Sequence, residues 1–231
     1  MALPLYLAMT REEIDSAPLP ANLAYMACHF SVYGKGLQDV PAHLPEGSML
    51  ILDDRIPVWD HDPRQVAEEL LQAVRRLGCG SLLLDFQRPG NHRTEEILQI
   101  LSRDVVIPWA VTEHYAVGAD CAVLVGAPAP NKPLRVGRWE GRELWLEVAV
   151  ETVQYTVTET ASTAAQLSQG PDSYPQRDDG LCCSYQVEAL EDRAIVTVSR
   201  TLEDLQKLMA QAESMGFACG VGLHQQLGGW E

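Results

Sequence analysis

The sequence has few basic residues for its length and no long apolar run. Its 231 residues include 17 Lys and Arg against 32 Asp and Glu, which gives a formal net charge of -15. Such a surface repels a phosphate backbone and an anionic bilayer alike, so we expect no nucleic-acid partner and no membrane partner. Apolar runs also stay well below the about 18 residues of a membrane span.

Motifs for metals, nucleotides and redox chemistry are absent as well. The six Cys form no CxxC, the six His form no HxxH or HExxH, and neither GxSxG nor a phosphate loop occurs. Gly34 and Gly36 lack the third glycine of a dinucleotide fingerprint. We therefore expect no cofactor and no metal.

The Cys lie in or beside apolar runs, which is typical of buried reduced thiols. The apolar N-terminus has no basic segment before it and reads as a first strand, so we expect a cytoplasmic protein.

Short apolar runs alternate with helical patterns, which predicts an α/β fold with a mostly parallel sheet. Eight runs qualify as strands, the number that closes a TIM-type (β/α)8 barrel. We expect residues 1–231 to form one such domain. The strand candidates are Pro4–Ala8, Leu23–His29, Ser48–Asp53, Ser81–Phe86, Val105–Val111, Cys121–Val125, Glu143–Val150 and Ala218–Leu223.

The helical ring of this barrel is expected to be incomplete. Helices are indicated over Arg64–Leu77, from Thr94 onward and after Thr201, but the segments on either side of the sixth strand are too short or too rich in proline for one. Exposed fifth and sixth strands would offer a surface for a homodimer. Between the seventh and eighth strands, Leu181–Val187 and Arg193–Ser199 predict a β-hairpin insertion, after the polar, turn-rich stretch Gln166–Asp179.

The C-terminal segments carry a family likeness. They are Leu181-Cys-Cys-Ser-Tyr-Gln, Ala194-Ile-Val-Thr-Val, Ser199-Arg-Thr-Leu-Glu-Asp-Leu, Gly216-Phe-Ala-Cys-Gly-Val-Gly-Leu and Leu227-Gly-Gly-Trp230. In order and spacing this part resembles glycoside hydrolase family 18, especially the bacterial enzymes that act on peptidoglycan and spore cortex. The resemblance implies a TIM barrel with an active site on its fourth strand.

The family motif on that strand, D-G-x-D-x-D-x-E, falls on Gly80-Ser-Leu-Leu-Leu-Asp-Phe-Gln87. The resemblance implies that Gly80 and Leu83 replace the first two Asp, that Asp85 is the third, and that Gln87 replaces the Glu which protonates the leaving oxygen. An amide has no proton to give at a useful pKa. The Trp of the family's last strand is also replaced, by His224 or Gln225.

Other polar residues follow the expected strand ends, where barrel sites form. They divide into candidate catalytic carboxyls, which are Asp85, Glu113 and Glu147, and candidate ligand contacts, which are Gln87, Asp53, Asp54, Tyr115, His29 and His224.

Three functions are open at this point. A degenerate barrel would bind an amino sugar or a cell-wall glycan fragment, a small carbohydrate ligand, with hydrolysis lost or weak. An active glycoside hydrolase would use the relocated acids Asp85, Glu113 and Glu147. A non-catalytic interaction protein would dimerise through the incomplete helical ring.

Overall fold

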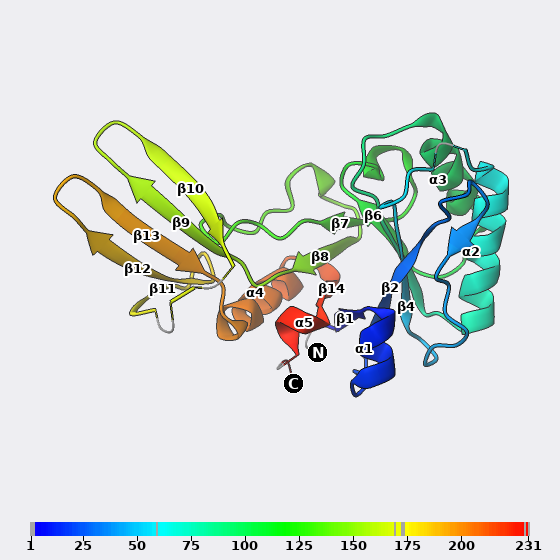
Figure 1. Cartoon of the computed structure of the whole chain (residues 1–231), viewed down its shortest axis with the longest axis horizontal. Coiled ribbons are helices and arrows are strands. Elements are labelled where there is room, and N and C mark those ends of the chain that lie inside the picture. The colour runs from blue at the N-terminus through cyan, green and yellow to red at the C-terminus, as the bar shows by residue number, and fades with distance from the viewer. Residues whose placement is uncertain (1–2, 59, 169, 172–173, 229, 231) are drawn as a thin grey trace.

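Eight parallel strands close into a barrel in the computed structural model, which describes residues 3–58, 60–168, 170–171, 174–228 and 230. The order around the barrel is β1-β14-β8-β7-β6-β5-β4-β2, and pairing of β2 with β1 closes it (Figure 1). The short β3 (Leu37–Gln38) pairs antiparallel with the end of β2. The barrel strands are β1 Leu5–Met9, β2 Leu23–Phe30, β4 Met49–Asp53, β5 Ser81–Asp85, β6 Trp109–Thr112, β7 Ala122–Val125, β8 Leu144–Val148 and β14 Phe217–Leu223. The predicted fold class is confirmed.

The helices begin and end at the residues that capping rules favour. Asp62 caps α2 with its side chain on the Arg64 amide, Pro63 is the first helical residue, and Gly78 ends the helix with a φ of 63°. The helix expected from Thr94 starts earlier, because the Asn91 side chain caps it. The helices are α1 Arg11–Ser16, α2 Pro63–Leu77, α3 His92–Asp104, α4 Leu202–Ser214 and α5 His224–Leu227.

The helical ring is interrupted where the sequence predicted it, since only 3-10 turns flank β7 among the described residues: η1 (Ala116–Gly118) and η2 (Gly137–Trp139). Loops nevertheless cover the outer face of these strands. Val111 of β6 and Val123 of β7 are fully buried. Arg142 pins the covering loops by donating hydrogen bonds to three backbone carbonyls, those of Ala116, Ala119 and Cys121.

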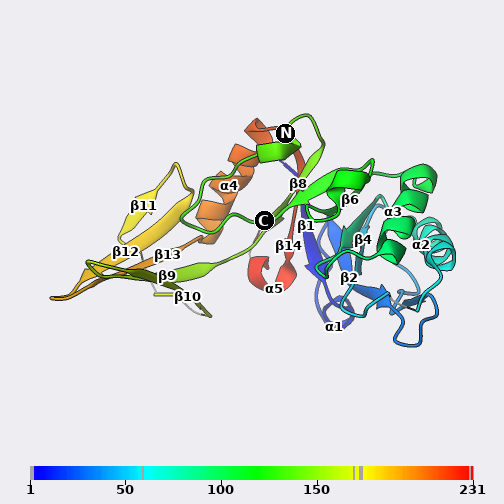
Figure 2. The ribbon, with the colours of Figure 1, turned by 90° about the horizontal axis from the view of Figure 1, so that it is seen from above.

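The chain segment between β8 and α4 forms a second, antiparallel sheet of five strands. This sheet projects to one side of the barrel (Figures 1 and 2). Its order is β10-β9-β13-β12-β11. The predicted hairpin forms its centre, and the polar stretch expected to be irregular contributes the end of β10 and all of β11. The strands are β9 Thr152–Val157, β10 Ser162–Leu167, β11 Gln176–Asp178, β12 Cys183–Ala189 and β13 Ala194–Ser199.

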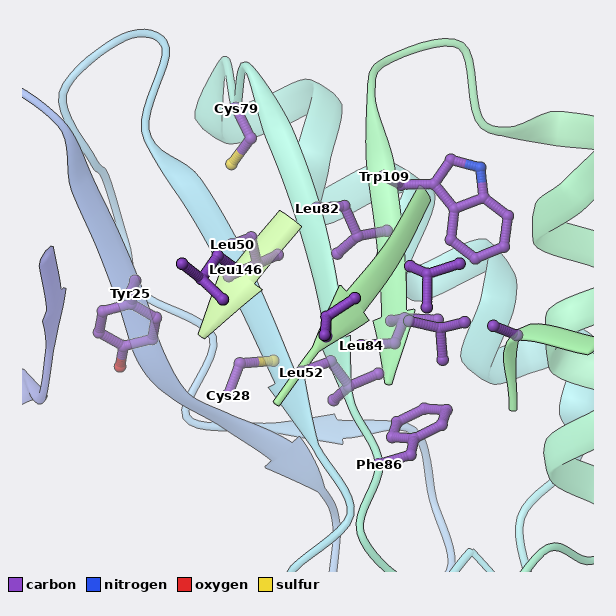
Figure 3. Packing of buried hydrophobic residues seen from close by; sticks show 14 of the residues in the cluster. Tyr25, Cys28, Leu50, Leu52, Cys79, Leu82, Leu84, Phe86, Trp109 and Leu146 are labelled. Atoms are coloured by element: carbon purple, nitrogen blue, oxygen red, sulfur yellow. The ribbon is translucent and has the colours of Figure 1, made fainter. Parts of the chain in front are cut away.

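Strand alternation divides the apolar residues into two clusters. The larger lies between the barrel wall and the helices, where Leu50 and Leu52 of β4 pair in register with Leu82 and Leu84 of β5 (Figure 3). A smaller cluster fills the barrel interior. It comprises Ala8, Ala24, Met49, Ile51, Leu83, Ala110, Ala122, Leu124, Trp145, Cys219 and Val221. At the carboxyl end of each strand, the residue two positions after the last interior residue points toward the barrel mouth. These residues therefore set the chemistry of the mouth.

Candidate site at the barrel mouth

A cavity of about 210 Å³ opens above the interior cluster, at the carboxyl ends of the strands. Three carboxyl side chains from three strands line it: Asp53 of β4, Asp85 of β5 and Glu147 of β8. Each follows an interior residue by two positions, because alternate side chains of a strand share a face. The other lining residues are mostly apolar: Ala8, Met26, Ile51, Leu83, Leu124, Val148, Ala149, Val221, Gly222, Leu223 and Gln226.

Gln87 lies just past the end of β5, exposed at the rim of this cavity. Its amide nitrogen Nε2 donates a hydrogen bond of 2.6 Å to Oδ1 of Asp85. Leu83 and Asp85 of β5 both line the cavity, whereas Gln87 lies beyond the end of the strand and reaches the site through this hydrogen bond. The side chain of Gln87 is therefore engaged with the neighbouring carboxylate of Asp85.

The Asp85 carboxyl is poorly compensated. Burial is the largest cause of its raised pKa, and the negative Asp53 and Asp54 act in the same direction. The hydrogen bond from Gln87 and the charge of Arg55 lower the pKa but do not cancel the shift. Asp85 therefore keeps a proton to higher pH than an exposed aspartate does.

The Glu147 carboxyl opens onto solvent through the mouth, yet protein surrounds it on its other sides. Burial raises its pKa, and repulsion from Asp85 and Glu151 adds to the rise, while a hydrogen bond with the backbone of Ala127 lowers it. Glu147 and Asp85 thus share one cavity and influence each other's ionisation.

Asp53 differs from these two carboxyls because it has a cation of its own. Arg55 Nε donates to both carboxylate oxygens of Asp53, at 2.8 and 2.7 Å, and Arg55 Nη2 donates to the Met26 carbonyl at 3.1 Å. The hydrogen bond to Asp53 is the main reason that the pKa of Arg55 is raised. Among the described residues that line the cavity, only Asp53 forms an ion pair with an arginine.

Asp54 faces away from the cavity and organises the loop after β5. It is 8% exposed, and its carboxylate accepts the backbone N–H of Gln87 at 2.9 Å and of Arg88 at 2.8 Å. Arg88 Nε in turn donates to the Asp54 carbonyl at 2.7 Å. Asp54 therefore holds the backbone that presents Gln87.

Four further candidates lie outside the cavity lining. Glu113 accepts a 2.6 Å hydrogen bond from Trp139 Nε1, and Tyr115 donates through its hydroxyl to the Arg88 carbonyl at 2.8 Å. His29 contacts the Phe30 carbonyl at 2.7 Å and Asp39 at 3.2 Å. His224 contacts Glu13 at 3.2 Å from the start of α5. The structure thus unites Asp53, Asp85, Gln87 and Glu147 and separates them from these four.

Gln226 and Met26 line the cavity although sequence reasoning did not single them out. Gln226 follows the last barrel strand on a helix of only four residues, and its Oε1 accepts the Val150 amide at 3.1 Å. The sequence signal that could have identified Gln226 is the pair of consecutive glutamines that follows the end of the last strand. The described residues contain no group of three or more His, Cys, Asp or Glu that could hold a metal ion. None of their helices is long and apolar enough to cross a bilayer.

These observations define the class of fold as a TIM-type α/β barrel, which the chain shares with solved structures that include family 18 chitinases. The chain is similar to the spore cortex-lytic enzyme SleL of Bacillus cereus, at 10% identity and a TM-score of 0.57 over 95% of this chain and 70% of that one. It is similar to a mutant family 18 chitinase from Cycas revoluta in complex with (GlcNAc)4, at 12% identity and a TM-score of 0.58 over 96% and 94%.

A chitinase-like agglutinin from Robinia pseudoacacia shares the fold at 10% identity and a TM-score of 0.56, over 95% of this chain and 94% of that one. No protein-family model and no curated protein matches the sequence. The likeness that the C-terminal segments predicted is confirmed at the level of the fold.

Proposed function

We propose that this protein binds an amino sugar or a cell-wall glycan fragment in the barrel-mouth cavity and does not hydrolyse it. The observation that carries the proposal is the carboxamide of Gln87, bound to Asp85 where family 18 hydrolases have their proton donor. Without an acid at position 87, departure of the leaving oxygen has no assistance from that position. A ligand would be held but not cleaved.

The cavity has the composition that a sugar ring needs. Apolar walls from Met26, Ile51 and Leu124 suit the C–H faces of the ring, and the carboxyls accept hydrogen bonds from hydroxyl and amide groups. Its volume of about 210 Å³ lies below the about 300–1,000 Å³ typical of pockets for drug-sized ligands. We therefore propose that one ring of the ligand enters and that the rest of a longer glycan lies outside.

The names of the neighbours in fold suggest a class of ligand for this proposal, and they do not bear on whether hydrolysis is lost. The Robinia protein is described as a chitinase-like agglutinin, and SleL as a spore cortex-lytic enzyme. One points to glycan binding on this fold, and the other to a cell-wall polymer. Fold alone does not fix function, so the site residues carry the argument and the neighbours indicate which ligands to try first.

The test is calorimetric titration with N-acetylglucosamine oligomers and with muropeptides, followed by analysis of the mixture for cleavage products. We expect saturable binding with the ligand recovered intact. The matched variants are Glu147→Gln, which changes a cavity carboxyl, and Glu143→Gln, which changes a glutamate at the opposite end of β8. Binding that the first weakens and the second leaves unchanged assigns the ligand to the mouth.

An active hydrolase with relocated acids is the second candidate. Asp85 and Glu147 line one cavity and both have a raised pKa, and a carboxyl with a raised pKa suits a general acid. Glu113 contributes nothing to this arrangement, since it is bound to Trp139 outside the cavity. Cleavage products that disappear in both Asp85→Asn and Glu147→Gln would favour this candidate over the first.

Dimerisation through the fifth and sixth strands, β6 and β7, has less support as a function. The face in question is already covered by loops, and Val111 and Val123 need no partner to be buried. We therefore place the carbohydrate ligand first among the expected partners.

A further inference from the structure

The two edges of the five-stranded sheet differ in their protection against pairing with another chain. β11 forms one edge and has three residues, two of them charged. Its Arg177 binds Glu203 and approaches Asp204 of α4, so the helix is attached to this edge. Short length and charge are two of the devices by which proteins block an edge strand.

β10 forms the other edge and has none of these devices. It spans six residues, of which Ser162 to Gln166 are exposed, and no described segment pairs with its outer side. Residues 160–171 contain no charged side chain, although 21% of the whole chain is charged. Proline is also absent from the strand, and its pairing with β9 runs through all six residues without a bulge. Half of the backbone N–H and C=O groups of such a strand point outward and are free to pair.

We propose that β10 pairs with β10 of a second copy of this chain, antiparallel, to form a continuous sheet across the two protomers. A two-fold axis perpendicular to the sheet, through Ala164 or Ala165, sets identical strands side by side. The contact is then self-complementary: small alanine side chains meet at its centre, and Ser162, Thr163 and Gln166 flank them without any charge. This surface is distinct from the barrel mouth, and the proposal does not depend on the proposed function.

The asymmetry of the sheet explains why this contact would stop at two copies. A two-fold contact uses the same edge on both protomers and is closed. The β11 edge is poorly suited to extend the assembly because it is short and charged, so we expect the sheet to grow at the β10 side only. Each protomer carries a net charge of -15, which opposes association, but the uncharged β10 segment places no like charges in direct contact.

A contact of one edge strand is small, and the dimer is expected to be weak. Interfaces below about 1,200 Å² in total belong to transient complexes. Analytical ultracentrifugation of the full chain should therefore cover about 10 μM to 1 mM. We expect reversible dimerisation that strengthens with added salt, because salt screens the repulsion between two negative protomers.

Ala164→Lys tests the surface without disturbing the core, because Ala164 is exposed. It brings two lysines together at the two-fold axis and should raise the dimer Kd at least roughly tenfold. Ala189→Lys is the matched control, with the same substitution at an exposed position on the same face of the sheet, on β12. Val187→Lys is a second control. It places a charge on the face of the sheet instead of its edge, at a side chain that is 52% exposed.

The proposal is supported if Ala164→Lys alone weakens the dimer. It is overturned by a monomer at every concentration and salt level. It is also overturned if Val187→Lys or Ala189→Lys weakens the dimer as much as Ala164→Lys, since the copies would then meet through the face of the sheet. Circular dichroism of all three variants checks that each is folded.

Discussion

Gln87 donates its side-chain amide to Asp85 at the rim of the barrel, over 2.6 Å. The bond uses one donor of the amide and one lone pair of the carboxylate, and leaves the other donor and the carbonyl oxygen of Gln87 facing the mouth. Gln87 can therefore both donate to a ligand and accept from it, whereas a protonated glutamate would offer its proton to a leaving group. The same strand end that would cut a sugar with Glu is suited to hold one with Gln.

Gln87→Glu tests whether the acid is the single missing part. We expect no turnover of a chromogenic chitobioside, because the family resemblance implies that Leu83 still replaces an Asp of the motif and that His224 or Gln225 replaces the Trp of the last strand. Release of chromophore, read by absorbance, is the measurement. Gln226→Glu is the control, since it also adds a carboxyl to the cavity but from α5. Turnover in Gln87→Glu alone would show that the rest of the machinery is intact and would contradict this expectation.

Asp85→Asn is expected to stabilise the protein at neutral pH. Asn keeps an oxygen that accepts the Gln87 hydrogen bond, and it removes a carboxylate whose ionisation is opposed by burial and by neighbouring negative charge. Because the folded-state pKa is raised, the wild-type carboxyl costs nothing below the unfolded pKa of about 3.9 and destabilises as pH rises through the folded value.

The measurement for Asp85→Asn is the Tm of both proteins from pH 3.5 to 8. The two curves should meet at the acid end and separate as pH rises, with the variant higher. Asp120→Asn, an exposed aspartate, should follow wild type throughout. A Tm of Asp85→Asn below that of wild type at pH 7 would show that the carboxylate is compensated in the fold.

Asp54→Ala should loosen the loop that presents Gln87. The substitution removes the carboxylate that accepts from the backbone N–H groups of Gln87 and Arg88, and a hydrogen bond to a charged group contributes about 1.5–3 kcal/mol. We expect a loss of that order in the free energy of unfolding, measured by urea denaturation, together with weaker ligand binding. Asp120→Ala is the control. Unchanged stability would contradict the role assigned to Asp54.

Glu113→Gln and Glu147→Gln separate the two positions that the sequence could not rank. Gln at position 113 can still accept from Trp139 Nε1, so we expect stability and ligand affinity near those of wild type. Gln at position 147 changes the cavity itself and should weaken binding several-fold, since one or two hydrogen bonds to a charged group change. Titration of both variants with the same oligomer provides the comparison. Equal losses would place Glu113 at the site.

Much of the fold could be predicted because each barrel strand is a compact apolar run with a clear end. Asp62, Pro63 and Gly78 specify α2 by local chemistry alone. The sixth strand was harder, because Val105 reads as apolar strand sequence but caps the end of α3, and the strand begins only at Trp109. The weak strands β10 and β11 could not be predicted, because they are made of small or polar residues that pair only where β9 and β12 offer an edge.

Some of the candidate site residues could likewise be placed from the sequence, and others could not. Alternation alone places Glu113 on the outer face, since Trp109 and Val111 of the same strand belong to the outer cluster, whereas Asp53, Asp85 and Glu147 follow interior residues. Which of two adjacent aspartates enters the cavity depends on where β4 ends, and the sequence leaves that open. Arg55 and Gln226 reach the mouth from beyond strand ends, through loop geometry that no periodic pattern encodes.

The central claim is that the barrel mouth binds a sugar that it cannot cleave. One titration of the wild-type protein with N-acetylglucosamine oligomers and muropeptides, followed by mass spectrometry of the recovered ligand, tests it most directly. We expect a saturable isotherm that Glu147→Gln weakens, with the ligand mass unchanged after prolonged incubation. A flat isotherm for every ligand, or shortened oligomers that are absent from the Asp85→Asn reaction, would contradict it.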